Sequence, residues 1–170
     1  MSDRVFVGLG SNLGDRIAQV LAAVDRIDEL PDTAVAAVST LLESDPVDVT
    51  DQPPFVNAVV DVRTTCRPLE LLDHLLAIEE AMGRCRHGVE RSGPRCIDLD
   101  ILLWGDVCMQ TPGLTIPHPR LHERSFVLLP LVELNEVAVH PTLGRTVTQL
   151  LADDIERHGP VCQRCRSLAT

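Results

Sequence analysis

Aromatic side chains are scarce in this sequence, since they make up 2% of the 170 residues and tyrosine is absent. Proteins that bind single-stranded nucleic acid stack the bases on aromatic residues set among basic ones. Positive charge is also in deficit: the formal net charge is −10, whereas proteins that bind a phosphate backbone are usually basic over a whole face. We therefore expect no nucleic-acid partner.

Long apolar runs are absent as well, and no stretch approaches the length that crosses a membrane. The first residues, Met1 to Arg4, lead directly into a short alternating segment, and not into a basic stretch followed by an apolar one. The six cysteines are scattered through a chain long enough to bury a core, which favours free thiols over a disulfide framework. We expect a cytoplasmic protein of one domain, residues 1–170, with no membrane contact and a polar tail over residues 156–170.

A basic loop followed by an acidic strand carries the strongest chemical signal. Residues 83–95 combine glycines and a proline with four arginines, Arg84, Arg86, Arg91 and Arg95, and predict a loop. From Cys96 to Trp104 the residues alternate, which predicts a strand. One face of that strand carries Ile97, Leu99, Ile101 and Leu103, and the other carries Asp98, Asp100, Leu102 and Trp104. Both carboxylates therefore point the same way.

Two ionised carboxylates on one face repel each other, by roughly 4 kcal/mol at about 4 Å and an effective dielectric of about 20. Mg²⁺ suits such a pair, because it takes one or two protein carboxylates and fills its other positions with water and substrate phosphate. The arginines would bind phosphate oxygens, and the loop could fold over a bound polyphosphate. The alternative is that Asp98 and Asp100 only form salt bridges with Arg91 and Arg95 on a solvated face. The basic loop favours a metal and phosphate site.

Strands and helices are expected to interleave along the rest of the chain. Alternation predicts strands over residues 4–10, 35–42, 55–62 and 107–109, and residues 43–54 predict a polar loop. Helical spacing predicts helices from the Asp15 cap to Pro31, from Pro68 to Gly83 and over 147–155 behind a Thr146 cap, with a run from Phe126 that breaks near Pro130. The pattern indicates an α+β, ferredoxin-like fold. We expect a mostly antiparallel sheet with helices packed on both faces, in three layers.

The segment 93–102, Gly-Pro-Arg-Cys-Ile-Asp-Leu-Asp-Ile-Leu, resembles the signature of the hydroxymethyldihydropterin pyrophosphokinases. These enzymes transfer pyrophosphate from ATP to a pterin alcohol in folate biosynthesis. The resemblance continues through the glycine-rich turn 8–14 and the segments 55–60, 116–118 and 124–131, and so covers about residues 4–151. The chain departs from the common pattern at Phe55, Ser92, Gly113 and Pro119, and none of these departures touches the two acids.

The resemblance implies a full set of ligands and site residues. Its catalytic residues would be Arg84, Arg95, Asp98 and Asp100, with the two acids holding two Mg²⁺ ions. ATP would be bound by Leu72, Glu79, Arg86, Ile101, Thr115, His118 and Arg124. The pterin would be bound by Ser44, Val47, Phe55, Asn57 and Phe126. The partners would be ATP and a pterin alcohol, and we expect a monomer.

Other interpretations of these residues stay open at this stage. A lone histidine such as His118, or a phenylalanine in an apolar helix such as Phe126, is usually structural, and an acid beside a helical stripe, such as Glu79, is usually solvated. The turn 8–14 is a tight structural turn or a wall of the pterin pocket. As a whole, the chain could instead be a non-catalytic paralogue that binds nucleotide or pterin, or a metal-dependent phosphohydrolase that uses the same acids.

Overall fold

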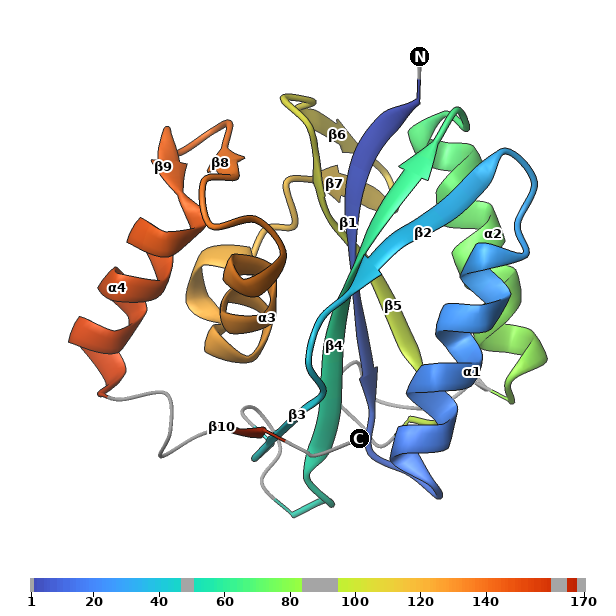
Figure 1. Cartoon of the computed structure of the whole chain (residues 1–170), viewed down its shortest axis with the longest axis horizontal. Coiled ribbons are helices and arrows are strands. Elements are labelled where there is room, and N and C mark those ends of the chain that lie inside the picture. Colours follow the sequence, from blue (N-terminus) through green and yellow to red (C-terminus); the bar gives the residue numbers. More distant parts are fainter. Residues whose placement is uncertain (1, 47–50, 84–94, 160–164, 168–170) are drawn as a thin grey trace.

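The computed structural model describes residues 2–46, 51–83, 95–159 and 165–167 (Figure 1). Its strands are β1 (Asp3–Ser11), β2 (Thr33–Val38), β3 (Leu42–Ser44), β4 (Phe55–Thr64), β5 (Asp98–Trp104), β6 (Met109–Thr111), β7 (Leu114–Ile116), β8 (Val139–His140), β9 (Arg145–Thr146) and β10 (Cys165–Ser167). Its helices are α1 (Arg16–Asp28), α2 (Pro68–Ala81), α3 (Ser125–Asn135) and α4 (Val147–His158), with a short 3-10 helix η1 (Leu121–Glu123).

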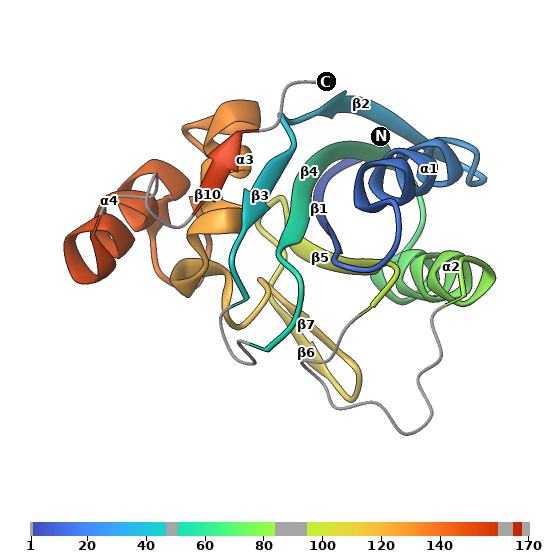
Figure 2. The same cartoon turned by 90° about the horizontal axis from the view of Figure 1, so that it is seen from below.

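The main sheet of the described residues runs in the order β10-β3-β4-β1-β5. Strand β2 also pairs with β4, along residues 60–64, whereas β3 pairs with residues 55–57. Strand β1 pairs antiparallel with both β4 and β5. The order β5-β1-β4-β2, with α1 after β1 and α2 after β4, is the ferredoxin-like arrangement. Helices α1 and α2 cover one face of this sheet, while α3 and α4 lie on the other (Figures 1 and 2). The predicted three-layer α+β fold is confirmed.

Two hydrophobic cores lie on the two faces of the sheet. The alternating residues Val5, Val7 and Leu9 of β1 pack into the core under α1 and α2. Phe6 and Val59, which point the other way, pack into the core under α3 and α4. The two-residue period of a strand thus sends alternate side chains to opposite cores. No described helix is both long and apolar enough to span a bilayer.

Two helices begin where their cap residues predicted. The Asp15 carboxylate accepts a hydrogen bond from the Ala18 N–H at 3.1 Å, ahead of α1. The Thr146 hydroxyl accepts one from the Gln149 N–H at 3.2 Å, ahead of α4. These bonds satisfy amides that a helix leaves without a partner in its first turn.

The predicted strand over 35–42 is wrong, because the chain there forms two strands, β2 and β3. The break falls at Ser39. Its hydroxyl accepts a hydrogen bond from the Val59 N–H at 2.9 Å, and its own N–H donates to the Val59 carbonyl at 3.0 Å. The chain thus stays attached to β4 while it bends. As a result Glu43 and Ser44 lie in β3, and not in the predicted loop 43–54.

The predicted break at Pro130 is also wrong, since α3 continues to Asn135 with this proline inside it. Proline removes one helical N–H and usually kinks a helix. Here Pro130 and its neighbours Leu128 and Leu131 are buried, and Leu128 and Leu131 pack into the core under α3 and α4. Burial of these side chains compensates for the missing hydrogen bond.

The alternation predicted for β5 holds only as far as Ile101. Phe6 pairs with Leu103 and Val7 with Ile101, so Leu102 is an extra residue in a β-bulge. Beyond it Leu103 packs into the core under α3 and α4, and Trp104 into the core under α1 and α2. The faces predicted for these two residues are therefore exchanged. Asp98 and Asp100 precede the bulge and keep their common face.

Candidate active site

A cavity of about 670 Å³ is lined by residues at one end of the sheet and by Phe126 and Val127 of α3. Its floor is formed by the second half of β1 and the first halves of β4 and β5. In this register Gly10 lies opposite Asn57 of β4 on one side and opposite Asp98 of β5 on the other. Paired residues share a face, so the two side chains flank a position without a side chain. Gly10 therefore leaves room for a ligand between the amide and the acid.

The two acids of β5 both line this cavity. Asp98 Oδ2 lies 2.5 Å from Arg95 Nη1, and both side chains are mostly buried. Asp100 is the more exposed acid, with 40% of its side chain accessible, and its Oδ2 lies 3.9 Å from His118 Nε2. The ion pair that the sequence offered as the alternative to a metal site is thus present for Arg95. It lies on a cavity wall, however, and not on a solvated sheet face.

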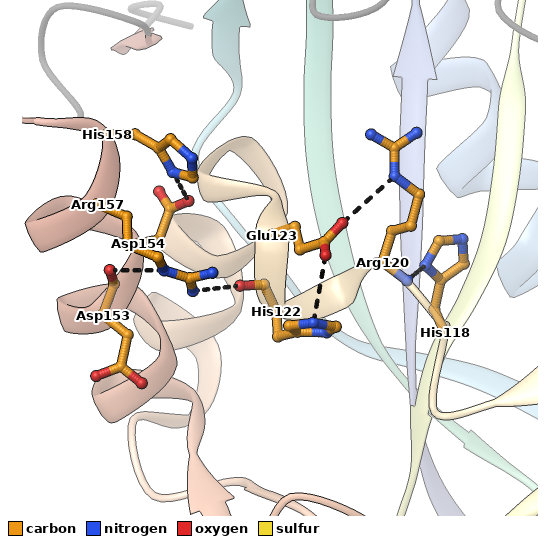
Figure 3. Close-up of polar contacts among 8 residues, drawn as sticks. All are labelled: His118, Arg120, His122, Glu123, Asp153, Asp154, Arg157 and His158. Atoms are coloured by element: carbon orange, nitrogen blue, oxygen red, sulfur yellow. Dashed lines mark hydrogen bonds and ion pairs between the residues drawn. The ribbon is translucent and has the colours of Figure 1, made fainter.

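His118 is held so that one ring nitrogen faces Asp100. The backbone N–H of His118 donates to the Leu102 carbonyl at 2.9 Å. Its ring nitrogen Nδ1 accepts from the backbone N–H of Arg120 at 3.1 Å (Figure 3). Burial lowers the pKa of His118 to about 4, helped by the positive charges of Arg124 and Arg120 and opposed by Asp98. The imidazole is therefore neutral at pH 7. Because Nδ1 accepts, the proton is on Nε2, which can donate to a ligand.

The predicted pterin residues gather around the other part of the cavity. Ser44, Phe55, Asn57 and Phe126 all line it. The Asn57 Nδ2 donates to Ser44 Oγ at 2.8 Å, and both side chains are buried. A β-carbon added to Gly10 would lie 3.4 Å from Asn57 Oδ1 and 3.9 Å from the Phe55 ring. The amide oxygen therefore lies next to the gap that Gly10 leaves.

Most of the predicted ATP residues line the same cavity. These are Leu72, Ile101, Thr115, His118 and Arg124. Glu79 is different: its side chain is buried, and its carboxylate accepts a hydrogen bond from the Leu99 N–H at 2.7 Å. It holds the backbone between the two acids, and it is not a solvated flank. Arg84, Arg86, Arg91 and Val47 lie outside the described residues, as does the loop that was expected to fold over polyphosphate.

Asn12 is a residue of this site that the sequence interpretation missed. It is buried, and its Oδ1 accepts from the Arg95 N–H at 2.8 Å. Its Nδ2 donates to Gln52 Oε1 at 3.0 Å and to the Pro53 carbonyl at 3.2 Å. One side chain thus joins β1 to Arg95 and to the segment before Phe55. The signal was its position in the turn 8–14, since asparagine amides commonly bind backbone groups in turns.

The donor set of the cavity fits magnesium. Asp98 and Asp100 offer hard carboxylate oxygens from one face of a single strand, which is the ligand type that Mg²⁺ prefers. Arginines 95 and 124 and the neutral imidazole of His118 surround them on the cavity wall. Together these groups can hold a metal-bound polyphosphate beside a pocket that carries an amide and aromatic rings. The site therefore contains the groups that metal-assisted phosphoryl transfer requires.

Comparison with known proteins identifies the family. The family model described as 7,8-dihydro-6-hydroxymethylpterin-pyrophosphokinase (HPPK) matches residues 6–136, and the chain belongs to this family. It is 47% identical over 152 residues to the 2-amino-4-hydroxy-6-hydroxymethyldihydropteridine pyrophosphokinase of Pseudomonas aeruginosa, covering 89% of this chain and 92% of that one. It is 41% identical over 146 residues to the protein of that name from Haemophilus influenzae, covering 86% and 89%.

A solved structure confirms the fold. Wild-type HPPK-DHPS of Plasmodium falciparum with pterin and p-hydroxybenzoate superposes with a TM-score of 0.77, at 16% sequence identity. The match covers all of this chain and 47% of that one. The chain therefore spans about half the length of that solved protein, and the likeness concerns the fold alone.

Proposed function

We propose that the chain transfers pyrophosphate from ATP to 6-hydroxymethyl-7,8-dihydropterin and releases the pterin diphosphate and AMP, a step of folate biosynthesis. Family membership supports this activity, as do relatives of that name that match over most of their length. The pterin hydroxymethyl oxygen loses its proton and bonds to the β-phosphorus of ATP, while the bond from that phosphorus to the oxygen of AMP breaks. Such transfers depend mainly on positioning and on stabilisation of charge.

The observation that carries this proposal is the arrangement around Gly10. Asn57 lies on one side of it and Asp98 on the other, within one cavity. An amide can pair with the mixed donor and acceptor edge of a pterin, and an acid can hold the metal of a nucleotide. The register of three strands thus supports a site in which the pterin alcohol lies close to the ATP phosphates.

Asp98 and Asp100 would hold two Mg²⁺ ions with the triphosphate. When bound, magnesium would neutralise phosphate charge and polarise the phosphoryl oxygens. In the free protein Arg95 compensates the charge of Asp98 at 2.5 Å. We propose that Arg95 leaves this carboxylate and binds phosphate oxygens when ATP binds, because Mg²⁺ would then balance the charge of the Asp98 carboxylate. Arg84 would act with it on the transferring and leaving phosphates.

The other residues would bind and orient the two substrates. His118 would donate its Nε2 proton to ATP, and Arg124 and Arg86 would contribute positive charge. Leu72, Ile101 and Thr115 would line the nucleotide pocket, with Glu79 fixing the backbone beneath it. Asn57 would bind the edge of the pterin ring, Phe55 and Phe126 would contact its faces, and Ser44 and Val47 would border it.

Product analysis tests the proposed reaction directly. The protein is incubated with ATP and Mg²⁺, with and without 6-hydroxymethyl-7,8-dihydropterin, and AMP, ADP and phosphate are quantified. We expect AMP, in amounts equal to the pterin diphosphate, and only when pterin is present. ADP or phosphate in the absence of pterin would instead indicate a phosphohydrolase. Binding of both ligands without any product would indicate a non-catalytic paralogue.

We also expect the monomer to be sufficient for activity. Apart from Glu79, every described side chain assigned above lines a cavity within one chain. Size-exclusion chromatography with light scattering, run at the concentration of the activity assay, tests this expectation. A stable dimer with the full activity confined to the dimer peak would contradict it.

A further inference from the structure

The C-terminal strand β10 lies against the edge of the main sheet next to the pterin side of the cavity. It pairs antiparallel with β3, so that Cys165 lies opposite Ser44 and Ser167 opposite Leu42. Figures 1 and 2 show β10 beside β3 in both views. This strand lies beyond residues 6–136, the part of the chain that matches the family model. It is therefore an addition to the part of the fold that the family model covers.

Without β10, β3 would be an edge strand. It has three residues, and its pairing with β4 joins Leu42 to Asn57 and Ser44 to Phe55. Such a short edge strand has few backbone hydrogen bonds and one open side, so it frays easily. With β10 in place, β3 has a partner strand on each side. The position of Ser44 is then determined from both sides of its backbone.

Ser44 matters because it orients Asn57. Its Oγ accepts the hydrogen bond from Asn57 Nδ2 at 2.8 Å, which leaves Oδ1 beside the gap at Gly10. If Ser44 moved, the Asn57 amide would lose the partner that fixes its rotation. The ion pair between Arg16 and Glu43, at 2.9 Å, also holds β3. It acts on the residue next to Ser44, so it does not replace the hydrogen bond between Ser44 and Asn57.

We propose that β10 is a positioning strand for pterin recognition: by pairing with β3 it holds Ser44 against Asn57 and so preorganises the amide that reads the pterin. This inference rests on the proposed function, which assigns Asn57 to the pterin. Preorganisation of one polar side chain changes affinity by about two- to tenfold. Loss of β10 should therefore raise the pterin Kd by about this factor. The ATP Kd should not change, because the acids lie on β5, away from β3.

The test compares one truncated and two substituted variants with the parent protein by isothermal titration with pterin and with a non-hydrolysable ATP analogue plus Mg²⁺. The first ends at Gly159. The second carries Cys165→Pro and Arg166→Pro. Neighbouring residues of an antiparallel strand point their N–H groups in opposite directions, so this pair removes one N–H that faces β3. The third carries Cys165→Ala and Arg166→Ala, which keep the backbone pairing, and is the matched control.

We expect the truncated and proline variants to bind pterin about two- to tenfold more weakly, with an unchanged Kd for the ATP analogue, and the alanine control to bind like the parent. Adding Asn57→Ala to the truncated chain should then cost little more than Asn57→Ala alone, because both changes remove the same contact. Unchanged pterin binding, equal losses for both ligands or strictly additive effects would overturn the proposal. If Asn57→Ala in the full chain leaves pterin binding unchanged, the assignment of the pterin site fails instead.

Discussion

The guanidinium of Arg124 lies over the ring of Phe126, with its central carbon 5.8 Å from the ring centroid. Both side chains line the cavity, and they are assigned to different substrates. We predict that Phe126→Ala weakens pterin binding by about tenfold or more, because it removes a stacking surface, and that it changes ATP binding little. Isothermal titration with each ligand measures both effects. Phe126→Leu, which keeps the apolar volume, is the control and should lose less.

Arg124→Ala should show the opposite preference, with a larger loss for ATP than for pterin. Arg67→Ala, which removes an exposed arginine side chain outside the cavity lining, controls for net charge.

Equal losses of both ligands in the Phe126 variants would mean that this ring is a core residue whose removal loosens the whole pocket.

Gly10→Ala is a second probe of the pterin side. The added methyl group would lie 3.4 Å from Asn57 Oδ1 and 3.9 Å from the Phe55 ring, which are ordinary contact distances. We therefore expect the variant to fold with a Tm close to that of the parent. It should nevertheless raise the pterin KM by about tenfold, because one methyl group in the wrong place costs about 1–3 kcal/mol in a fitted pocket. A parental pterin KM would show that the ring does not occupy this gap.

The buried His118 predicts a specific acid sensitivity. Its pKa is about 4 in the folded chain, below the ordinary value of 6.5, mainly because of burial. As the pH falls, the unfolded chain binds the proton first, so the stability present above pH 6.5 is lost progressively down to pH 4. The total for this one group is about 3 kcal/mol. Between pH 7.5 and pH 5 we expect about 2 kcal/mol of that loss.

Urea unfolding of the parent and of His118→Gln, each at pH 7.5 and pH 5, isolates this contribution. Glutamine keeps a polar group of similar size but does not titrate. The variant should lose less stability on acidification than the parent. If the two proteins lose the same amount, His118 does not have the lowered pKa.

Asn12 is predicted to support catalysis through Arg95. Asn12→Ala leaves the Arg95 N–H and the Gln52 side chain without this partner, and an unsatisfied buried group costs about 1–3 kcal/mol. We expect a lower Tm together with a fall in kcat, because Arg95 is then less well placed. Asn12→Asp keeps the acceptor for the Arg95 N–H. It should restore a larger fraction of the parental kcat than of the parental stability. Loss of stability with a parental kcat in Asn12→Ala would show a purely structural residue.

The sequence predicted the elements whose signals are local. One such signal is the alternation of Val5, Val7 and Leu9, which share one core as expected. Another is the pair of helix caps at Asp15 and Thr146, which depend only on residues close by in the chain. The common face of Asp98 and Asp100 follows from the period of a strand in the same way. The family signature then linked this face to a substrate class, which the residues alone did not do.

The features that the sequence did not predict depend on distant contacts. The bulge at Leu102 is set by pairing with β1, and the bend at Ser39 by two hydrogen bonds to Val59. Asn12 and Arg95 are 83 residues apart in the chain, so no local pattern joins them. Strand β10 forms by pairing with β3, so its own sequence does not predict it. Tertiary contacts of this kind override local propensity.

The proposed metal site for pyrophosphoryl transfer is the pair Asp98 and Asp100. Its most direct test is the rate of AMP formation by Asp98→Asn as a function of Mg²⁺ concentration, with Asp153→Asn, an acid on α4 outside the cavity lining, as the control for charge. We predict a fall of about a thousandfold or more for Asp98→Asn, with a parental Tm, and parental activity for Asp153→Asn. Turnover of Asp98→Asn within tenfold of the parent, with the same magnesium dependence, would contradict it.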